Sequence, residues 1–142
     1  MIYPDRADLH IHTTISDGTD TPEEILALVK KAGVGVFSVT DHDAIRGCET
    51  VMQLLGADDP LFIPGIEFSC KDELGKYHIL GYAYDTKSRT VRDLVLKCHE
   101  NRMTKVWDRL DGLKDEFHIT FPEEEIMKLL SRSNPGKPIW AT

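Results

Sequence analysis

Residues 6–18 read RADLHIHTTISDG, a short strand-like run with two histidines two positions apart and an aspartate in the turn that follows. Residues i and i+2 of a strand point to the same side of a sheet. A strand over residues 7–12 therefore directs His10 and His12 to one face, with Asp17 close behind them. Imidazole and carboxylate groups gathered in this way are typical of metal sites. The remaining sequence decides whether further ligands join them.

The composition is that of a globular domain. The chain has 142 residues, 41% of them hydrophobic and 29% charged, which argues against a disordered chain. No stretch approaches the roughly 20 apolar residues of a bilayer span, and residues 1–8 lack the features of a signal peptide. The net charge of −7 argues against wrapping of duplex nucleic acid. We therefore expect neither a membrane nor a nucleic-acid duplex as partner.

The three cysteines, Cys48, Cys70 and Cys98, are odd in number, widely spaced and not in CxxC pairs. This usage predicts neither a disulfide framework nor a cysteine zinc site, and it is typical of a reducing cytoplasm. We expect a cytoplasmic protein whose cysteines are small core residues.

Strand and helix patterns alternate along the first part of the chain. Residues 20–33 predict a helix, with Thr21 and Glu24 as a capping box and Gly33 as its end. The other expected elements are strands over 7–12, 35–41, 61–70 and 77–85, a helix over 44–55, and two helical pieces within 89–131. Pro64–Gly65 predicts a bend or an edge in the third strand. The alternation favours parallel strands with helical crossovers, either open or barrel-like.

Residues 71–76, KDELGK, predict a hairpin turn between the third and fourth strands. If Lys71 lies opposite Lys76, Glu67 and His78 become diagonal neighbours on one face, with Cβ atoms about 7–8 Å apart. That spacing suits two side chains that converge on one cation. The same register places Ser69 opposite His78 and Glu67 opposite Leu80.

The segment TDHD at residues 40–43 ends the second strand and brings His42 to the same rim as His10 and His12. Four strand ends then each offer a histidine or a carboxylate. A mixture of imidazole and carboxylate without thiolate favours Mn, Fe or Zn of the hydrolytic kind.

Four segments in order, DLHIHTTISDG, VTDHD, IPGIEFSC and YHILGYAYD, resemble the successive motifs of the PHP (polymerase and histidinol phosphatase) family. The resemblance is close over residues 7–85 and looser to residue 138. It implies a distorted seven-stranded β/α barrel with two or three metal ions in its mouth, used mostly to hydrolyse phosphoesters. The metal ligands that it implies, with Glu67 bridging two ions, are His10, His12, Asp17, His42, Glu67 and His78.

The helices after the fourth strand most resemble those of small stand-alone family members. Those members act on nucleoside 3′,5′-bisphosphates and the 5′ ends of short RNAs. The resemblance therefore implies a metal-dependent phosphoesterase that uses metal-activated water, and no serine or cysteine stands in an activating motif. The alternative is a catalytically impaired metal-binding half-barrel that serves as an assembly module or is a fragment.

The sequence departs from the family pattern in two places. The family barrel continues beyond the point at which this chain stops and carries its remaining ligands there, and Ile139 stands where the family usually has a histidine. We thus expect an α/β fold: residues 1–88 as the N-terminal half of a truncated PHP barrel, and residues 89–142 as a truncated helical insertion. We also expect this chain to be much less active than a complete family member.

Other polar residues have competing interpretations. Asp43 suits orienting a metal-bound imidazole, or capping a helix, better than ligating a metal itself. Arg102, Lys105 and Arg109 share one helix face, which is either a solvated charged face or, by the resemblance, places Arg102 on a substrate phosphate. His99 lacks a partner motif, as does His118, and we interpret both as ordinary histidines.

A barrel cut after four strands exposes unpaired edges and uncovered apolar faces, which are association sites. We expect the strand over 35–41 to be central and the strand over 77–85 to lie at an open edge. A second copy of the chain covers such an edge most simply. We therefore expect a homo-oligomer, most simply a dimer, in which His99 or His118 of the neighbouring copy could complete the site.

Overall fold

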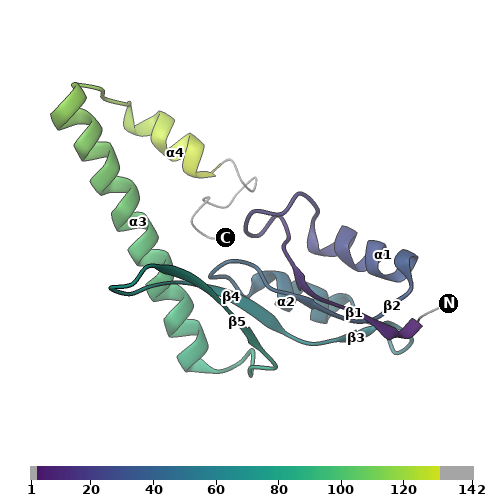
Figure 1. Ribbon diagram of the computed structural model, residues 1–142. Helices are drawn as coiled ribbons and strands as arrows, with labels where there is room; N and C mark the ends of the chain where they lie inside the picture. The colour runs from purple at the N-terminus through teal and green to yellow at the C-terminus, as the bar shows by residue number, and fades with distance from the viewer. Residues whose placement is uncertain (1–2, 132–142) are drawn as a thin grey trace.

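The computed structural model describes residues 3–131 and shows an α/β fold in which strands and helices alternate as far as the third strand (Figure 1). The elements are β1 (Tyr3–Ile11), α1 (Pro22–Ala32), β2 (Val34–Val39), α2 (Arg46–Leu54), β3 (Leu61–Phe62), β4 (Gly65–Lys71), β5 (Lys76–Tyr82), α3 (Arg89–Phe117) and α4 (Glu123–Ser131). Strands β1, β2 and β3 form a parallel sheet in that order, and β4 pairs with β5 in an antiparallel one. The predicted helical crossovers between parallel strands are confirmed.

The hydrophobic core lies between the parallel sheet and the first two helices. Phe37 and Val39 of the central strand β2 are fully buried, and Ile25, Leu26 and Val29 of α1 and Val51 of α2 pack in the same cluster. Burial of such side chains contributes about 1.5–3 kcal/mol each. The central position expected for the second strand is confirmed.

The capping box predicted for α1 is present. The Thr21 hydroxyl accepts the Glu24 N–H at 3.2 Å, and the Glu24 carboxylate accepts the Thr21 N–H at 2.8 Å. Gly33 ends the helix in the left-handed conformation, with φ 70°. These caps fix where α1 begins and therefore how the preceding loop, which carries Asp17, returns to the sheet.

The prediction of one bent strand over residues 61–70 is wrong, because the chain forms two strands that belong to different sheets. Pro64 has no N–H for a ladder, and a Cβ at Gly65 would overlap the Ser38 hydroxyl and come within 3.0 Å of the Val39 carbonyl oxygen. The chain therefore crosses β2 closely at Gly65. A parallel bridge between His42 and Glu67 joins the two sheets.

The predicted hairpin register is confirmed: Lys71 pairs with Lys76, Ser69 with His78, and Glu67 with Leu80. Within the described residues β5 pairs only with β4, as expected for an edge. The described strands form two sheets rather than a closed barrel, so the half-barrel stays a prediction. Ile139 lies outside the described residues.

The predicted break between two helical pieces is confirmed, since α3 ends at a left-handed His118 with φ 58° and α4 begins after Pro122. Helix α3 contains no fully buried residue and extends away from the sheets (Figure 1). Two ion pairs attach it, Arg92 to Glu49 and Arg102 to Asp43. In the described part of the chain, no helix has the length and apolar character needed to cross a membrane.

The cysteines differ from one another in their surroundings. Cys48 is buried in the core, where its thiol lies 3.0 Å from the Gly65 carbonyl oxygen, and burial raises the pKa of that thiol to about 11. Cys70 and Cys98 are only partly buried, so the expectation that all three are core residues is wrong. Cys70 lies on β4 and Cys98 on α3.

Gly65→Ala should destabilise the protein by about 1–3 kcal/mol, because the added methyl group meets the backbone of β2. Gly112→Ala is the matched control: its Cβ would meet nothing within 4 Å, and alanine in a helix interior should stabilise by about 0.5–1 kcal/mol. Chemical denaturation of both variants measures the difference. Equal stabilities would show that β4 does not cross β2 as closely as described.

The expected dimer stays a prediction, with β5 or the helices after it as its interface. Ile79 of β5 is 55% exposed and Leu96 of α3 is 58% exposed, which leaves apolar surface for a second copy. Size-exclusion chromatography with light scattering should give twice the chain mass at micromolar concentration. A stable monomer would contradict this expectation.

Candidate metal centre

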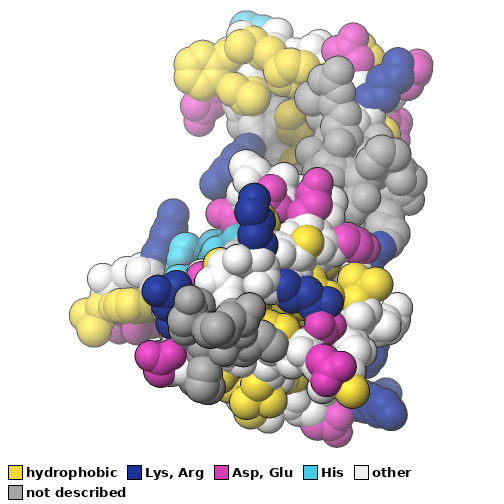
Figure 2. All heavy atoms as spheres, turned by 90° about the vertical axis from the view of Figure 1, so that its right-hand side faces the viewer, with side chains coloured by type: hydrophobic (Ala, Val, Ile, Leu, Met, Phe, Trp, Pro, Cys, Tyr) yellow, Lys and Arg dark blue, Asp and Glu magenta, His cyan; other side chains and the backbone are white. Residues whose placement is uncertain are grey.

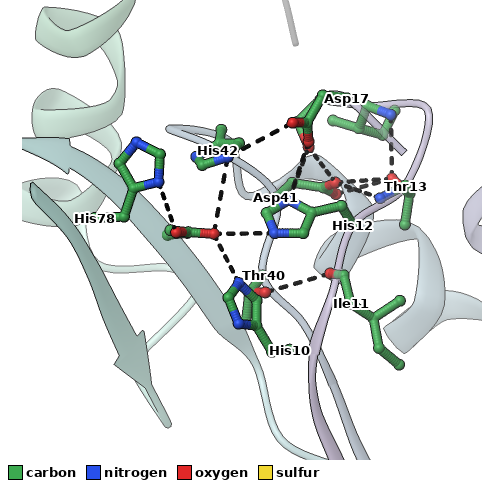
Figure 3. A network of polar contacts seen from close by, with 12 residues as sticks. His10, Ile11, His12, Thr13, Asp17, Thr40, Asp41, His42 and His78 are labelled. Carbon is green, nitrogen blue, oxygen red and sulfur yellow. Dashed lines mark hydrogen bonds and ion pairs between the residues drawn. The ribbon is translucent and has the colours of Figure 1, made fainter. Parts of the chain in front are cut away.

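The six predicted ligands lie together at one end of the sheets (Figure 3). They come from several elements: His10 from the end of β1, His12 and Asp17 from the loop after it, His42 from the loop after β2, Glu67 from β4 and His78 from β5. Parallel strands present their carboxyl ends at the same edge, and the hairpin brings the last two residues to that edge. The convergence predicted from the motif spacing is present.

Glu67 lies at the centre of the cluster. One carboxylate oxygen, Oε2, is 2.9 Å from His10 Nε2 and 2.9 Å from His12 Nε2. The other, Oε1, is 3.0 Å from His78 Nδ1. The residue is only 4% exposed, whereas the His10 and His78 side chains are about half exposed. The cluster therefore has a buried acidic floor and an open, imidazole-lined side.

The electrostatics of Glu67 favour its charged form. Burial alone raises the pKa of this carboxyl, but the hydrogen bond with His10 and the charges of His42, His10 and His12 outweigh burial. The net effect holds the pKa of Glu67 below its usual value. An ionised carboxylate is the form that can bridge cations.

A second group of ligand atoms surrounds Asp17. Its carboxylate is 3.2 Å from His12 Nδ1 and 3.7 Å from His42 Nε2, and His42 Nε2 is 3.8 Å from Glu67. Three ligand groups thus overlap through shared residues: His10, His12 and Glu67; His12, Asp17 and His42; and His42, Glu67 and His78. Because the three groups share His12, His42 and Glu67, the cluster could hold more than one metal ion.

His12 belongs to two of these groups through different ring nitrogens. A neutral imidazole has one nitrogen that carries a proton and one with a free lone pair. Its Nδ1 faces two oxygens, of Asp17 at 3.2 Å and of Ser16 at 3.4 Å, whereas Nε2 faces Glu67. A proton on Nδ1 leaves Nε2 free, so His12 best joins His10 and Glu67 as a ligand.

These residues fit divalent metal ions. Two donors that each lie about 2.1 Å from one ion at a right angle are about 3.0 Å apart. The distances from Glu67 to its three nearest imidazole nitrogens are 2.9, 2.9 and 3.0 Å. The set contains only imidazole and carboxylate donors, which suits Mn, Fe or Zn.

Asp41 organises the site, although sequence reasoning passed over it. It is 1% exposed, and its Oδ1 accepts the Thr13 N–H at 2.7 Å and the Ser16 hydroxyl at 2.8 Å (Figure 3). Burial raises the pKa of Asp41, while the hydrogen bonds from Thr13 and Ser16 lower it in part. Asp41 thereby holds the loop between His12 and Asp17. Its place in TDHD, one residue before the candidate ligand His42, was the available signal.

Asp43 supports the site without belonging to any of the three ligand groups. Its backbone is left-handed, with φ 51°, and its carboxylate accepts the Ser69 N–H at 2.9 Å and an Arg102 N–H. It does not cap α2, whose first turn has no side-chain cap. The helix-capping interpretation is wrong, and Asp43 instead links β4 to α3.

Arg102 is not part of a purely solvated face, because it pairs with Asp43 and its side chain is 38% exposed. Lys105 and Arg109 form no ion pair with the described residues. His99 is partly buried and His118 ends α3, and neither belongs to the three ligand groups. Burial and the nearby Arg102 charge lower the pKa of His99.

The PHP domain family model matches residues 8–131 of the chain. This chain belongs to the PHP domain family. The match spans every residue of the cluster and continues through α3 to the end of α4. Membership therefore rests on the site and on the helices that follow it.

Several relatives are longer proteins. The 5′-3′ exoribonuclease Rnm of Salmonella typhimurium is 32% identical over 69% of this chain and 34% of its own length. The phosphoribosyl 1,2-cyclic phosphate 1,2-diphosphodiesterase of Eggerthella lenta is 34% identical over 75% of this chain and 41% of its own length. This chain thus spans between a third and two fifths of the length of these relatives.

A solved structure from Bifidobacterium adolescentis, assigned as a metal-dependent phosphoesterase, is also similar. It superposes with a TM-score of 0.68 at 25% sequence identity, covering 83% of this chain and 42% of the other. The superposition supports the arrangement of strands and helices described above.

Glu67→Gln should strongly reduce metal content, because it removes the negative charge that faces three imidazole nitrogens. Glu124→Gln is the control, since that side chain lies on α4, pairs with Lys128 and is 81% exposed. Elemental analysis after dialysis against a divalent ion measures both variants. Full metal content in Glu67→Gln would contradict a central role for this carboxylate.

Proposed function

We propose that this PHP-family chain is a metal-dependent phosphoesterase, or the metal-binding part of one. The observation that carries the proposal is the buried Glu67 carboxylate, held within 3.0 Å of imidazole nitrogens from β1, the loop after it and β5, with an open side above it. An enclosed structural site would surround its ion with protein ligands, whereas a catalytic one keeps a position open. The exposed His10 and His78 side chains mark that open position.

The protein's own groups define what the site can do. Bound divalent ions lower the pKa of water and offset charge on a phosphate. His10, His12 and Glu67 present their donor atoms to one ion, and Asp41 keeps the loop with Asp17 in place through Thr13 and Ser16. We propose two or three ions of Mn, Fe or Zn. No side-chain nucleophile is needed for such chemistry.

The proposed substrate is a small phosphorylated molecule, such as a nucleoside 3′,5′-bisphosphate or the 5′ end of a short oligonucleotide. Two similar proteins are named for the cleavage of phosphoesters, one in RNA and one in a cyclic sugar phosphate. Arg102 lies next to the site through its contact with Asp43. An arginine guanidinium can bind a phosphate through two parallel hydrogen bonds (bidentate binding). We propose that Arg102 binds a substrate phosphate in this way. Cytoplasmic location is part of the same proposal.

Phosphate release from a nucleoside 3′,5′-bisphosphate, measured together with metal content, tests the proposal. We expect release that depends on added divalent ion, disappears with chelator and falls at least about tenfold in Glu67→Gln, as for loss of a transition-state interaction. Glu124→Gln should retain full activity. Bound metal without release from any phosphoester would instead support the alternative, a catalytically impaired metal-binding half-barrel.

A further inference from the structure

Two lysines lie beside the metal cluster on the same face of the β4–β5 hairpin. Lys71 pairs directly with Lys76, and the next pair on that face is Ser69 with His78. Side chains of directly opposed residues point to the same side, as do residues two apart. Lys71 and Lys76 therefore share a face with His78, about 7 Å further along β5, and with Glu67, about 14 Å further along β4.

This pairing is unfavourable for the hairpin itself. Like charges that lie directly opposite each other in an antiparallel pair destabilise it. Both lysines are exposed, and neither forms an ion pair with any of the residues described. The turn between them carries two acidic residues: Asp72 accepts the N–H groups of Leu74 and Gly75 at 2.8 and 3.0 Å, and neither Asp72 nor Glu73 pairs with Lys71 or Lys76 in the described residues. The described part of the fold therefore supplies no stabilising partner for either ammonium group.

The surroundings favour an anion at this position. The whole chain carries a net charge of −7, and Figure 2 shows Lys and Arg as well as Asp and Glu side chains around the histidines. Ser69 lies between the lysine pair and Glu67 on β4, and its backbone N–H holds Asp43, which in turn holds Arg102. Ammonium groups thus extend the positive side of the site along the hairpin.

We propose that Lys71 and Lys76 form a subsite for a second phosphate of the substrate, adjacent to the phosphate that reacts at the cluster. This inference rests on the proposed phosphoesterase function. Two lysine ammonium groups attract a phosphate as point charges with rotatable donors. The lysine pair is two strand residues, or about 7 Å, from His78 of the metal cluster. This spacing suits two phosphates separated by one nucleoside unit. The site would then select substrates with at least two phosphates.

The test compares three substrates with the full chain: a nucleoside 3′-monophosphate, a nucleoside 3′,5′-bisphosphate and a short 5′-phosphorylated oligoribonucleotide. The variant is Lys71→Ala/Lys76→Ala. The matched control is Lys31→Ala, an exposed lysine near the end of α1, at the opposite end of the β-strands from the cluster. The measurement is kcat/KM for each substrate at several salt concentrations.

We expect the double variant to lose about tenfold in kcat/KM on a substrate with a second phosphate and to keep its value on the monophosphate. If kcat/KM falls on the bisphosphate as well as on the oligonucleotide, the lysines bind the second phosphate of the same nucleotide. If kcat/KM falls on the oligonucleotide alone, they bind the next internucleotide phosphate. The slope of log kcat/KM against log salt concentration should also become shallower by about 0.7 for each phosphate that the lysines no longer neutralise. Equal losses on all three substrates, or none, would overturn the subsite.

Two further measurements separate this inference from the proposed function and from a folding defect. If the wild-type chain releases no phosphate, the proposed phosphoesterase function is wrong. The subsite is then tested by calorimetric binding of the same three nucleotides, where the double variant should bind more weakly only those that carry a second phosphate. Absence of any preference for a second phosphate in binding overturns it. Because the lysines repel each other, the double variant should keep or raise its melting temperature; a large decrease would indicate a structural role and contradict the proposal.

Discussion

The buried carboxylate of Glu67 is the group on which both sheets depend. A buried charge is costly unless neighbouring groups compensate it, and here imidazoles from β1, the following loop and β5 do so. The backbone of the same residue joins the sheets, because its N–H donates to the Asp41 carbonyl at 3.2 Å and its carbonyl accepts the Asp43 N–H at 2.9 Å. One residue thus assembles the site and closes the seam between the sheets.

The buried carboxylate of Asp41 is the second group that holds the site together. It binds the loop after β1 through Thr13 and Ser16, and a Cβ at Gly47 of α2 would overlap its Oδ2. The same buried carboxylate therefore limits how α2 begins and where Asp17 stands. The Asp41 carboxylate contacts both α2 and the loop that carries Asp17. A substitution that moves one of these segments therefore also displaces the other.

The sequence predicts this structure where local rules decide it. The Thr21 capping box, the helix break before Pro122 and the Lys71–Lys76 register each depend on a few neighbouring residues, and each is confirmed. The positions of the candidate ligands followed from that register and from the strand ends. The division of residues 61–71 between two sheets was not predictable, because it depends on how closely Gly65 approaches β2.

The polar supports were equally hard to foresee. Asp41 and Asp43 flank the candidate ligand His42 in TDHD and look alike in sequence, yet one holds a loop and the other holds Arg102. Their roles follow from contacts with residues 25 to 59 positions away, and no local pattern encodes those distances. The sequence therefore predicts which candidate ligands lie together better than it predicts the groups that hold them in place.

Helix α3 has a mechanical consequence that follows from its attachments. It rests on the body through Arg92 and Arg102, has no fully buried residue, and continues from Arg102 to Phe117 without further ion pairs to the sheets in the described residues. That outer part is about 22 Å long. A tilt of about 10° at Arg102 displaces its far end by about 4 Å. The helix thus pivots at the contact between Arg102 and Asp43. A ligand that draws Arg102 away from Asp43 displaces the far end of the helix, near Phe117, more than any other part of its outer half.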